Sequence, residues 1–435
     1  MTIPTQQLPA FKVPVITGMG IVTPFGQNIN VFKTALEQGL SAIDFITADE
    51  NIAPITISAK LRDFDFRQWL EKAEVNDTLK DKALRLGIRA PLGIQTSIIS
   101  SLEAWQQAFP DSMQVDPHRM GIIVTGNNTT TALSYQHYQD FKNAPTRISP
   151  AYAMHFLDTN HLGYISELFN IQGEGFSVGN ASASGNGAII QASRLIQLGI
   201  VDCCVVVGVM AELSVMELQA LRNLNVLGGT VYAKDPKSAC RPFDSQHEGF
   251  IPGQASACLI LESETHAHSR QAPILGKILG SSIALDANHL TNPNVKGEAY
   301  VMREAIARAG IEKKDINYIN AHGTSSVLGD EVELQALHEV FGECLNKIWI
   351  NSTKSITGHC VWSAGIVETI AILLQMNNNF LHPNLNLDNP IDTTCLLVGK
   401  SKMDIALHYA INNSFGFGGI NTSIVLEKGN NHDKR

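Results

Sequence analysis

Two histidines and a lysine stand in segments of this 435-residue chain that could carry chemistry. His322 lies in NAHGTSS, directly after an apolar run, while Lys354 and His359 lie in STKSITGH, after a second apolar run. Catalytic groups are common on loops at strand ends. A lone histidine is more often structural, but two histidines and a lysine in such positions predict one shared site.

Ser182 lies in a third unusual segment, SVGNASASGNG, which is a run of small residues before a segment of helical period. A side chain at a helix N-terminus meets free N–H groups and the positive end of the helix dipole, where a nucleophile or an oxyanion is stabilised. The alternative is a serine or asparagine that only caps the helix. A fourth segment, NNSFGFGG, places Phe417 in an aromatic turn rich in glycine.

Three familiar motifs are absent from the sequence. Gly18 and Gly20 are followed by Thr23 where a dinucleotide fingerprint needs glycine, and no phosphate-binding loop of the type GxxxxGK[ST] occurs. The context of Ser182 lacks both glycines of a hydrolase nucleophile elbow.

Short apolar, β-branched runs alternate with segments of helical period, which predicts strands alternating with helices. The expected strands are 13–17, 121–125, 203–209, 258–262, 274–279, 316–320, 347–351 and 422–426. Because several of these runs are continuously apolar, we expect a buried sheet with helices on both faces, that is, an α/β protein.

Composition excludes several classes of protein. Hydrophobic residues make up 44% of the chain and charged residues 17%, so a folded protein is expected. A net charge of −9 without a Lys/Arg cluster argues against a nucleic-acid partner. No apolar stretch is long enough for a membrane span and no secretion signal is visible, so we expect a cytoplasmic protein without membrane contact. Seven scattered cysteines without a CxxC pair favour neither disulfides nor a metal site.

Together these segments resemble the β-ketoacyl-carrier-protein synthase family, the ketosynthases of fatty-acid and polyketide assembly. The matching segments are ITGMGIVTP (16–24), RPFD (241–244), GFIPG (249–253), NAHGTS, STKSITGH and NSFGFGG. The resemblance covers nearly the whole chain. It implies that His322 and His359 are the catalytic histidines, Lys354 the catalytic lysine and Phe417 the gating phenylalanine.

The resemblance also implies a thiolase-like fold, with two duplicated α/β halves stacked as five α-β-α-β-α layers. We expect an N-terminal half over residues 1–265 containing Ser182, a C-terminal half over residues 266–428, and a polar tail at 429–435. A rise in polarity near 265–273 is the sequence signal for the boundary.

Serine replaces the nucleophile at the decisive position. Ketosynthases carry the acyl chain on cysteine in a segment resembling TACASG, whereas this chain reads NASASG with Ser182 at that position. A thiol readily becomes a thiolate at a helix N-terminus, but a hydroxyl needs a dedicated base. None of the seven cysteines replaces it by sequence position, including Cys360 beside His359. We therefore expect chain elongation to be lost or badly slowed. His247, Glu248 and Gln254 are smaller departures to which the sequence assigns no role.

Decarboxylation of a malonyl thioester needs no cysteine, and in the family the two histidines stabilise the resulting enolate oxygen. The chain therefore resembles the decarboxylating ketosynthase-like proteins of polyketide β-branching cassettes, which make acetyl-carrier protein from malonyl-carrier protein. One alternative is a chain-length factor, the non-condensing subunit of a ketosynthase heterodimer, which does not require the histidines or the lysine. Another is a serine-dependent acyltransferase or condensing enzyme.

The resemblance implies an acyl carrier protein as partner, with the substrate on its phosphopantetheine arm, and a homodimer. For a chain-length factor, the dimer would instead form with a cysteine-containing ketosynthase. We expect no cofactor and no metal ion bound to this chain.

Overall fold

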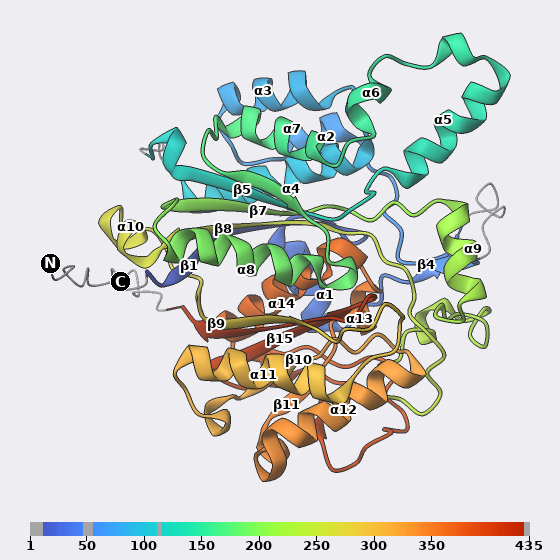
Figure 1. Ribbon diagram of the computed structural model, residues 1–435, viewed down its shortest axis with the longest axis vertical. Helices are drawn as coiled ribbons and strands as arrows, with labels where there is room; N and C mark the ends of the chain where they lie inside the picture. The colour runs from blue at the N-terminus through green and yellow to red at the C-terminus, as the bar shows by residue number, and fades with distance from the viewer. Residues whose placement is uncertain (1–11, 47–54, 111–114, 430–435) are drawn as a thin grey trace, which may run out of the picture.

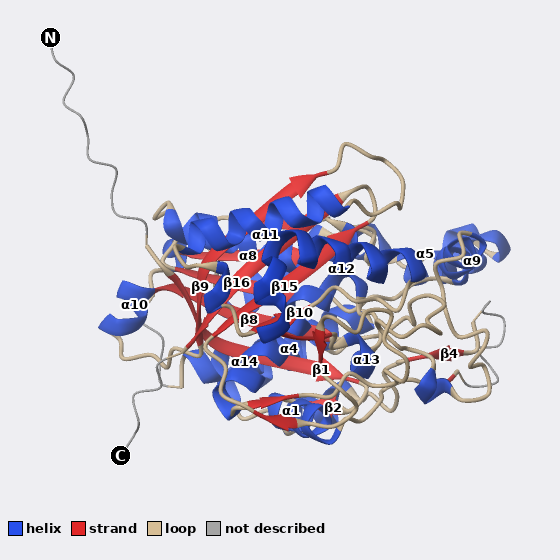
Figure 2. Ribbon diagram, turned by 90° about the horizontal axis from the view of Figure 1, so that it is seen from below, coloured by secondary structure: helices blue, strands red, loops and turns tan. Residues whose placement is uncertain are grey.

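The computed structural model describes residues 12–46, 55–110 and 115–429. Residues 430–435, which are most of the expected polar tail, lie outside the described residues. Residues 1–11 of the expected N-terminal half also lie outside them. Figures 1 and 2 show stacked layers of strands and helices. No helix in the described ranges combines the length and the apolar character needed to cross a bilayer.

The helices of the described residues are α1 Ile29–Gln38, α2 Phe66–Glu71, α3 Asp77–Gly87, α4 Leu92–Ala108, α5 Thr131–Asn143, α6 Tyr152–His155, α7 Thr159–Phe169, α8 Ser184–Gln197, α9 Val215–Asn223, α10 Glu264–Ser269, α11 Val295–Ala309, α12 Val327–Phe341, α13 Lys354–Thr357 and α14 Ala364–Asn378. The main strands are β1 Pro14–Thr23, β5 Met120–Thr125, β6 Gly175–Val178, β7 Cys203–Gly208, β8 Ser256–Ser263, β9 Gly276–Leu285, β10 Tyr318–Asn320, β11 Trp349–Asn351, β13 Leu396–Leu397, β15 Tyr409–Gly416 and β16 Ile420–Lys428. Short strands are β2 Gly26–Gln27, β3 Asp44–Phe45, β4 Ile57–Ser58, β12 Phe380–Leu381 and β14 Met403–Asp404.

The two halves of the chain repeat one topology. In the first half the strands lie in the order β1-β8-β7-β5-β6, and in the second in the order β9-β16-β15-β10-β11. If the five main strands of each half are numbered 1 to 5 along the chain, both halves have the spatial order 1-5-4-2-3. The pairing directions also agree, because in each half the first two pairs along this order are antiparallel and the next two are parallel. This repeat confirms the expected duplicated α/β fold.

A short pairing joins the two sheets. Val15 and Ile16 at the start of β1 pair with Lys277 and Gly276 at the start of β9, so the strands form one continuous ladder. Figure 1 shows the resulting layers: α4 and α7 outside the first sheet, α8 and α14 between the sheets, and α11 and α12 outside the second.

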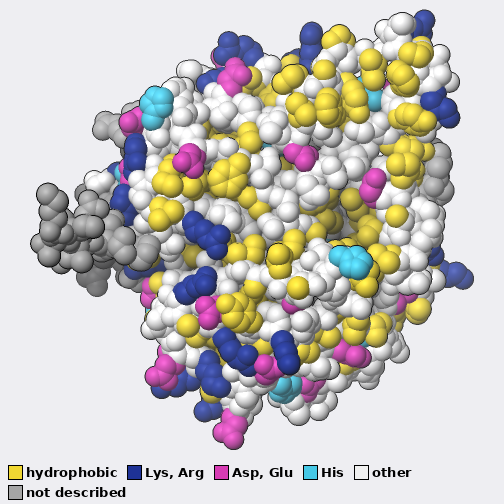
Figure 3. All heavy atoms as spheres, in the orientation of Figure 1, with side chains coloured by type: hydrophobic (Ala, Val, Ile, Leu, Met, Phe, Trp, Pro, Cys, Tyr) yellow, Lys and Arg dark blue, Asp and Glu magenta, His cyan; other side chains and the backbone are white. Residues whose placement is uncertain are grey.

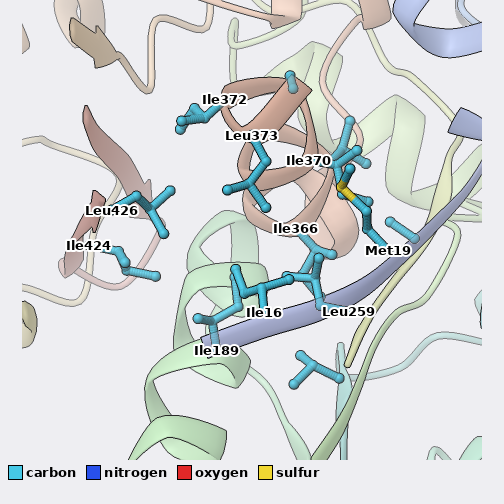
Figure 4. Packing of buried hydrophobic residues seen from close by; sticks show 14 of the residues in the cluster. Ile16, Met19, Ile189, Leu259, Ile366, Ile370, Ile372, Leu373, Ile424 and Leu426 are labelled. Atoms are coloured by element: carbon cyan, nitrogen blue, oxygen red, sulfur yellow. The ribbon is translucent and has the colours of Figure 1, made fainter. Parts of the chain in front are cut away.

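The middle layer explains the apolar runs of the sequence. Every residue of α14 from Ala364 to Met376 is buried, which is expected of a helix enclosed between two sheets. Its Ile366, Ile370 and Leu373 belong to the same hydrophobic cluster as Ile16 and Leu426 on the adjoining sheets (Figure 4).

All eight expected strands are present, and β1 is longer than expected. Three of the main strands, β6, β13 and β15, were not predicted. β1 continues past residue 17 through Gly18 and Gly20. A Cβ on either glycine would lie 2.1 Å from a backbone oxygen of α4, so the close packing of β1 against this helix requires glycine at both positions. β15 was not predicted as a strand, since its buried centre reads Asn412-Asn413-Ser414 instead of an apolar run. Nδ2 of Asn412 donates toward oxygens of Asn186, Gly365 and Thr369, and its Oδ1 accepts from Nδ2 of Asn320.

Candidate active site

Two equivalent turns of the duplicated fold face each other at the centre of the molecule. In the first half, β6 leads to the 3-10 turn Ala181–Ala183, which contains Ser182 and starts α8. In the second half, β11 and α13 lead to His359 and then to the 3-10 turn Val361–Ser363, which starts α14. The symmetry of the fold therefore brings residues 177 positions apart into contact.

Both turns have the same unusual backbone. Ala181 and Val361 have φ angles of 48° and 47°, in the left-handed region that L-residues rarely adopt. The helices that follow approach so closely that a Cβ on Gly185 would lie 2.7 Å from the nitrogen of Gly365, and a Cβ on Gly365 would lie 2.6 Å from the nitrogen of Asn186. The local strain and the glycine contact together fix how the two turns meet.

Three of the predicted site residues lie together. The Oγ atom of Ser182 is 2.8 Å from Nε2 of His359. The rings of His322 and His359 are perpendicular, with their centroids 5.7 Å apart. Phe415 packs edge-on against His322, and Phe250 packs edge-on against His359, so apolar rings hold both imidazoles in place.

The hydrogen-bond partners of the histidines define which ring nitrogen carries the proton. Nδ1 of His359 accepts a hydrogen bond from the backbone N–H of Val361 at 3.3 Å. Nδ1 of His322 lies 3.4 Å from Nζ of Lys354, and an ammonium group can only donate. Both protons are therefore on Nε2, and each imidazole is a hydrogen-bond donor on its cavity side.

Both imidazoles are held in the neutral form. Burial lowers the pKa of His322 and of His359 well below the ordinary value of 6.5, and the positive charge of Lys354 lowers both further. The same ammonium disfavours a metal cation beside the two rings.

Lys354 lies behind His322 and is almost fully buried. Its Nζ donates to the backbone carbonyl of His322 at 2.6 Å and forms an ion pair with Glu368 on α14. Burial raises the pKa of Glu368, and the ammonium of Lys354 counteracts that effect. The lysine thus orients the His322 loop and supplies a positive potential without lining the cavity.

Sequence reasoning missed two acidic residues that support the site, Glu368 and Glu333. The carboxylate of Glu333 accepts hydrogen bonds from the backbone N–H groups of His322 and Gly323, both at 2.8 Å. Burial raises its pKa to about 7. For Glu368 a signal existed, since it is the single charged residue in the apolar segment AGIVETIAILL. Glu333 lies in an ordinary charged helix and gave none.

A cavity of about 640 Å³ opens in front of these residues. Ser182, His322, His359 and Phe417 line it, and the hydroxyl side chain of Thr324 lies on its wall. The residues known to line it, within the part of the chain that the structure describes, include no cysteine. Cys360 is buried elsewhere, and burial raises the pKa of its thiol to about 12.

The structure gives the three unexplained departures positioning roles. Nδ1 of His247 lies 3.1 Å from the carboxylate of Asp330. Glu248 accepts hydrogen bonds from the backbone N–H groups of residues 229–231 at 2.7–3.1 Å. Gln254 bridges the backbones of two further segments through both ends of its amide. Each therefore ties loops together and contributes no group to the Ser182 and histidine cluster.

Comparison with known families agrees with this architecture. Residues 13–267 match the N-terminal domain of beta-ketoacyl synthases, and residues 275–388 match their C-terminal domain. The chain therefore belongs to the beta-ketoacyl synthase family.

Two curated relatives match along nearly their whole length. The polyketide biosynthesis malonyl-ACP decarboxylase PksF of Bacillus subtilis is 36% identical over 414 residues, which cover 95% of this chain and 96% of the relative. The 3-oxoacyl-[acyl-carrier-protein] synthase 2 of Coxiella burnetii is 30% identical over 423 residues, covering 95% of this chain and 98% of the relative.

Solved structures share the fold. A beta-ketoacyl synthase from Burkholderia phymatum superposes with a TM-score of 0.82 at 26% identity, covering 96% of this chain and 99% of that one. A ketosynthase in the type II polyketide synthase complex AntDE:AntF, solved with its acyl carrier protein, has a TM-score of 0.83 at 24% identity, covering 96% of this chain and 100% of that one.

Proposed function

We propose that the protein decarboxylates a malonyl thioester carried by an acyl carrier protein and so produces the acetyl thioester. The bond between the carboxylate and the α-carbon breaks, carbon dioxide leaves, and the electron pair forms an enolate with its charge on the thioester oxygen. A proton then adds to the α-carbon. The name of the Bacillus subtilis relative, at 36% identity over almost the entire chain, supports this reaction.

The observation that carries the proposal is the pair of neutral imidazoles with Nε2–H donors on the cavity side. The thioester oxygen becomes an oxyanion only as the reaction proceeds, so donors placed beforehand lower the barrier to decarboxylation. His322 supplies one such donor. His359 supplies the second when its Nε2–H exchanges the Ser182 hydroxyl oxygen for the thioester oxygen of the bound substrate, and Lys354 adds a positive potential behind them.

The same hydrogen bonds argue against an acyl-serine. His359 donates to Ser182 because its Nδ1 already accepts from Val361, so it cannot serve as the base that a serine nucleophile needs. Without an acyl-enzyme there is no electrophile for the enolate to attack, and the product is acetyl. The proton at carbon comes from water in the cavity, either directly or through the hydroxyl of Ser182, which regains its own proton from that water.

Phe417 is proposed as a lid over the malonyl carboxylate. It follows Gly416, precedes Gly418 with φ of 86°, lines the cavity and is 41% exposed, so its ring has room to move. An apolar cover removes water from the carboxylate and favours its loss as carbon dioxide. Phe417→Ala should slow turnover while the unfolding temperature is unchanged; a variant as fast as the parent would remove Phe417 from the mechanism.

The proposal includes an acyl carrier protein as partner, with the phosphopantetheine arm reaching through the 640 Å³ cavity. We place the activity in polyketide β-branching, where the acetyl group is passed to an enzyme that adds it to a β-ketone. We also propose a homodimer. Among the described residues, the edge strand β6 has one unpaired side. Tyr138, Phe141, Met154 and Phe156 of the segment around α5 and α6 are exposed, and hydrophobic side chains gather at the upper right of Figure 3, where α5 and α6 lie in Figure 1.

Mass spectrometry of malonyl-carrier protein incubated with the purified protein alone tests the reaction. We expect conversion to acetyl-carrier protein, with no acetoacetyl product when an acyl donor is added. His359→Ala is the matched control for contaminating decarboxylase. Unchanged malonyl-carrier protein would overturn the proposal in favour of a chain-length factor, and an acyl adduct on Ser182 would favour a serine-dependent acyltransferase.

A further inference from the structure

A histidine, an aspartate and a cysteine converge at the far end of α12 from the active site. His338 lies in the last turn of this helix, and Asp392 and Cys395 lie in the loop that enters β13. Nε2 of His338 is 2.6 Å from Oδ2 of Asp392 and 3.5 Å from Sγ of Cys395, and that sulfur is 3.4 Å from the same carboxylate oxygen. The three atoms form a compact triangle of a nitrogen, an oxygen and a sulfur.

The triangle has nearly the dimensions of three ligands of a tetrahedral zinc ion. With Zn–N and Zn–O bonds of about 2.0 Å and a Zn–S bond of about 2.3 Å, ligand sulfur lies about 3.5 Å from nitrogen or oxygen, and nitrogen about 3.3 Å from oxygen. The two observed sulfur separations already fit. The nitrogen–oxygen separation must widen by about 0.7 Å, which is possible because the side chain of His338 is 42% exposed.

The surroundings hold the ligands and leave one direction open. Thr394 donates from its backbone N–H and its hydroxyl to Oδ1 of Asp392 at 2.7 and 2.6 Å, which turns Oδ2 toward His338 and Cys395. Carboxylate ligands of metal ions are commonly oriented by such bonds. Cys395 is buried beneath, whereas His338 faces solvent, so a water molecule can complete the coordination.

We propose that His338, Asp392 and Cys395 bind one zinc ion, with water as the fourth ligand. Imidazole and thiolate favour zinc over magnesium or calcium. On binding, the thiol proton of Cys395 is released to solvent, and the Nε2 proton of His338 is replaced by one on Nδ1, so that nitrogen, carboxylate and thiolate each donate an electron pair. Burial, reinforced by Asp392, raises the pKa of the Cys395 thiol to about 12, and a cation in this position reverses that effect.

The ion would link α12 to the segment before β13 across more than 50 residues of sequence. The N-terminal residues Val327 and Leu328 of the same helix line the active-site cavity. The ion would lie remote from the reacting groups and would fix the helix on which one wall of the cavity is built.

Cobalt spectroscopy tests the site directly. Full-length protein is stripped with a chelator and titrated with Co²⁺. We expect one equivalent to produce a thiolate-to-cobalt charge-transfer band that zinc abolishes by displacement. Cys395→Ser should lose this band, while Cys344→Ser, which removes a half-buried free thiol in the turn after α12, should keep it.

A second measurement separates ligand loss from misfolding. Zinc should raise the unfolding temperature of the parent and of Cys344→Ser but not that of Asp392→Asn, and circular dichroism should show all of these variants folded. A missing band in the parent, a band that persists in Cys395→Ser, or equal zinc stabilisation of Asp392→Asn would overturn the proposal. None of these results depends on the proposed decarboxylation.

Discussion

At the scale of single residues, the site is organised by which atoms donate and which accept. The ammonium of Lys354 faces Nδ1 of His322, and the backbone N–H of Val361 donates to Nδ1 of His359. Both imidazoles therefore present Nε2–H groups to the same cavity. Serine in place of a thiol leaves this donor pair intact and removes only the acyl carrier. With this arrangement, the protein keeps the decarboxylation step of ketosynthase chemistry and loses the condensation step.

Removing either donor should cost far more than removing the serine. His322→Ala or His359→Ala should slow decarboxylation by roughly 10²–10³, the usual loss for one oxyanion donor. Ser182→Ala should cost less than about tenfold, since both donors remain and water can supply the proton. Single-turnover conversion of malonyl-carrier protein measures all three variants. Rates that are indifferent to both histidines, or a serine variant as slow as a histidine variant, would contradict the assignment.

The neutral histidines make a prediction about pH. The folded-state pKa values of His322 and His359 lie well below 6.5, so both rings stay neutral when the pH falls to that value. The decarboxylation rate should therefore be flat between pH 8 and about 6.5, the range in which an ordinary histidine would become charged. A rate profile on malonyl-carrier protein checks this. A fall in rate with an apparent pKa near 6.5 would show that a charged imidazole inhibits the enzyme under these conditions.

The sequence alone predicted the functional residues that lie in recognisable motifs. It missed the residues that come together only when the chain folds. Ser182, His322 and Lys354 each stand in a distinctive segment. Glu333 has no such setting, and the triad of His338, Asp392 and Cys395 spans 57 residues, far outside the spacing of any metal motif. Contacts at such separations follow from the topology and not from local sequence.

At the scale of elements, the two strained turns depend on the close crossing of α8 and α14. The strand β11 before α14 was predicted from its apolar run, but the half-exposed β6 before α8 was not. The crossing distance was not predictable either, because a glycine within a helix does not by itself indicate a close contact with another helix. The buried polar strand β15 was missed for a related reason: Asn412 bonds the backbone of Gly365 at this crossing.

A pair of glycine substitutions tests the crossing. Gly185→Ala should destabilise the protein by about 1–3 kcal/mol, because the new methyl would lie 2.7 Å from the backbone of Gly365. Gly163→Ala, at an exposed position of α7 with open space around it, should instead stabilise by about 0.5–1 kcal/mol. Denaturant unfolding compares the two variants. Equal effects would mean that helix propensity, and not the contact between α8 and α14, determines the stability at Gly185.

At the scale of the whole molecule, duplication explains why the site lies at the centre. The same order of five strands in each half makes the two central helices equivalent, and their N-terminal turns must then meet near the pseudo-symmetry axis. Periodicity in the sequence predicted alternating strands and helices but not five layers, which came from the resemblance to a family. The order in which strands pair is a long-range property that local patterns do not encode.

The final prediction concerns the assembly of two copies. An exposed sheet edge favours pairing with a second strand, and such pairing would also cover Phe176, an exposed apolar side chain on that edge. Light scattering should give twice the chain mass of 47.3 kDa for the parent. Phe176→Lys, on the exposed edge strand β6, should shift the protein toward monomer, whereas Tyr300→Lys, on α11 in the outer layer over the second sheet, should leave it dimeric. A parent that elutes as a monomer, or two variants that dissociate equally, would exclude this edge as the interface.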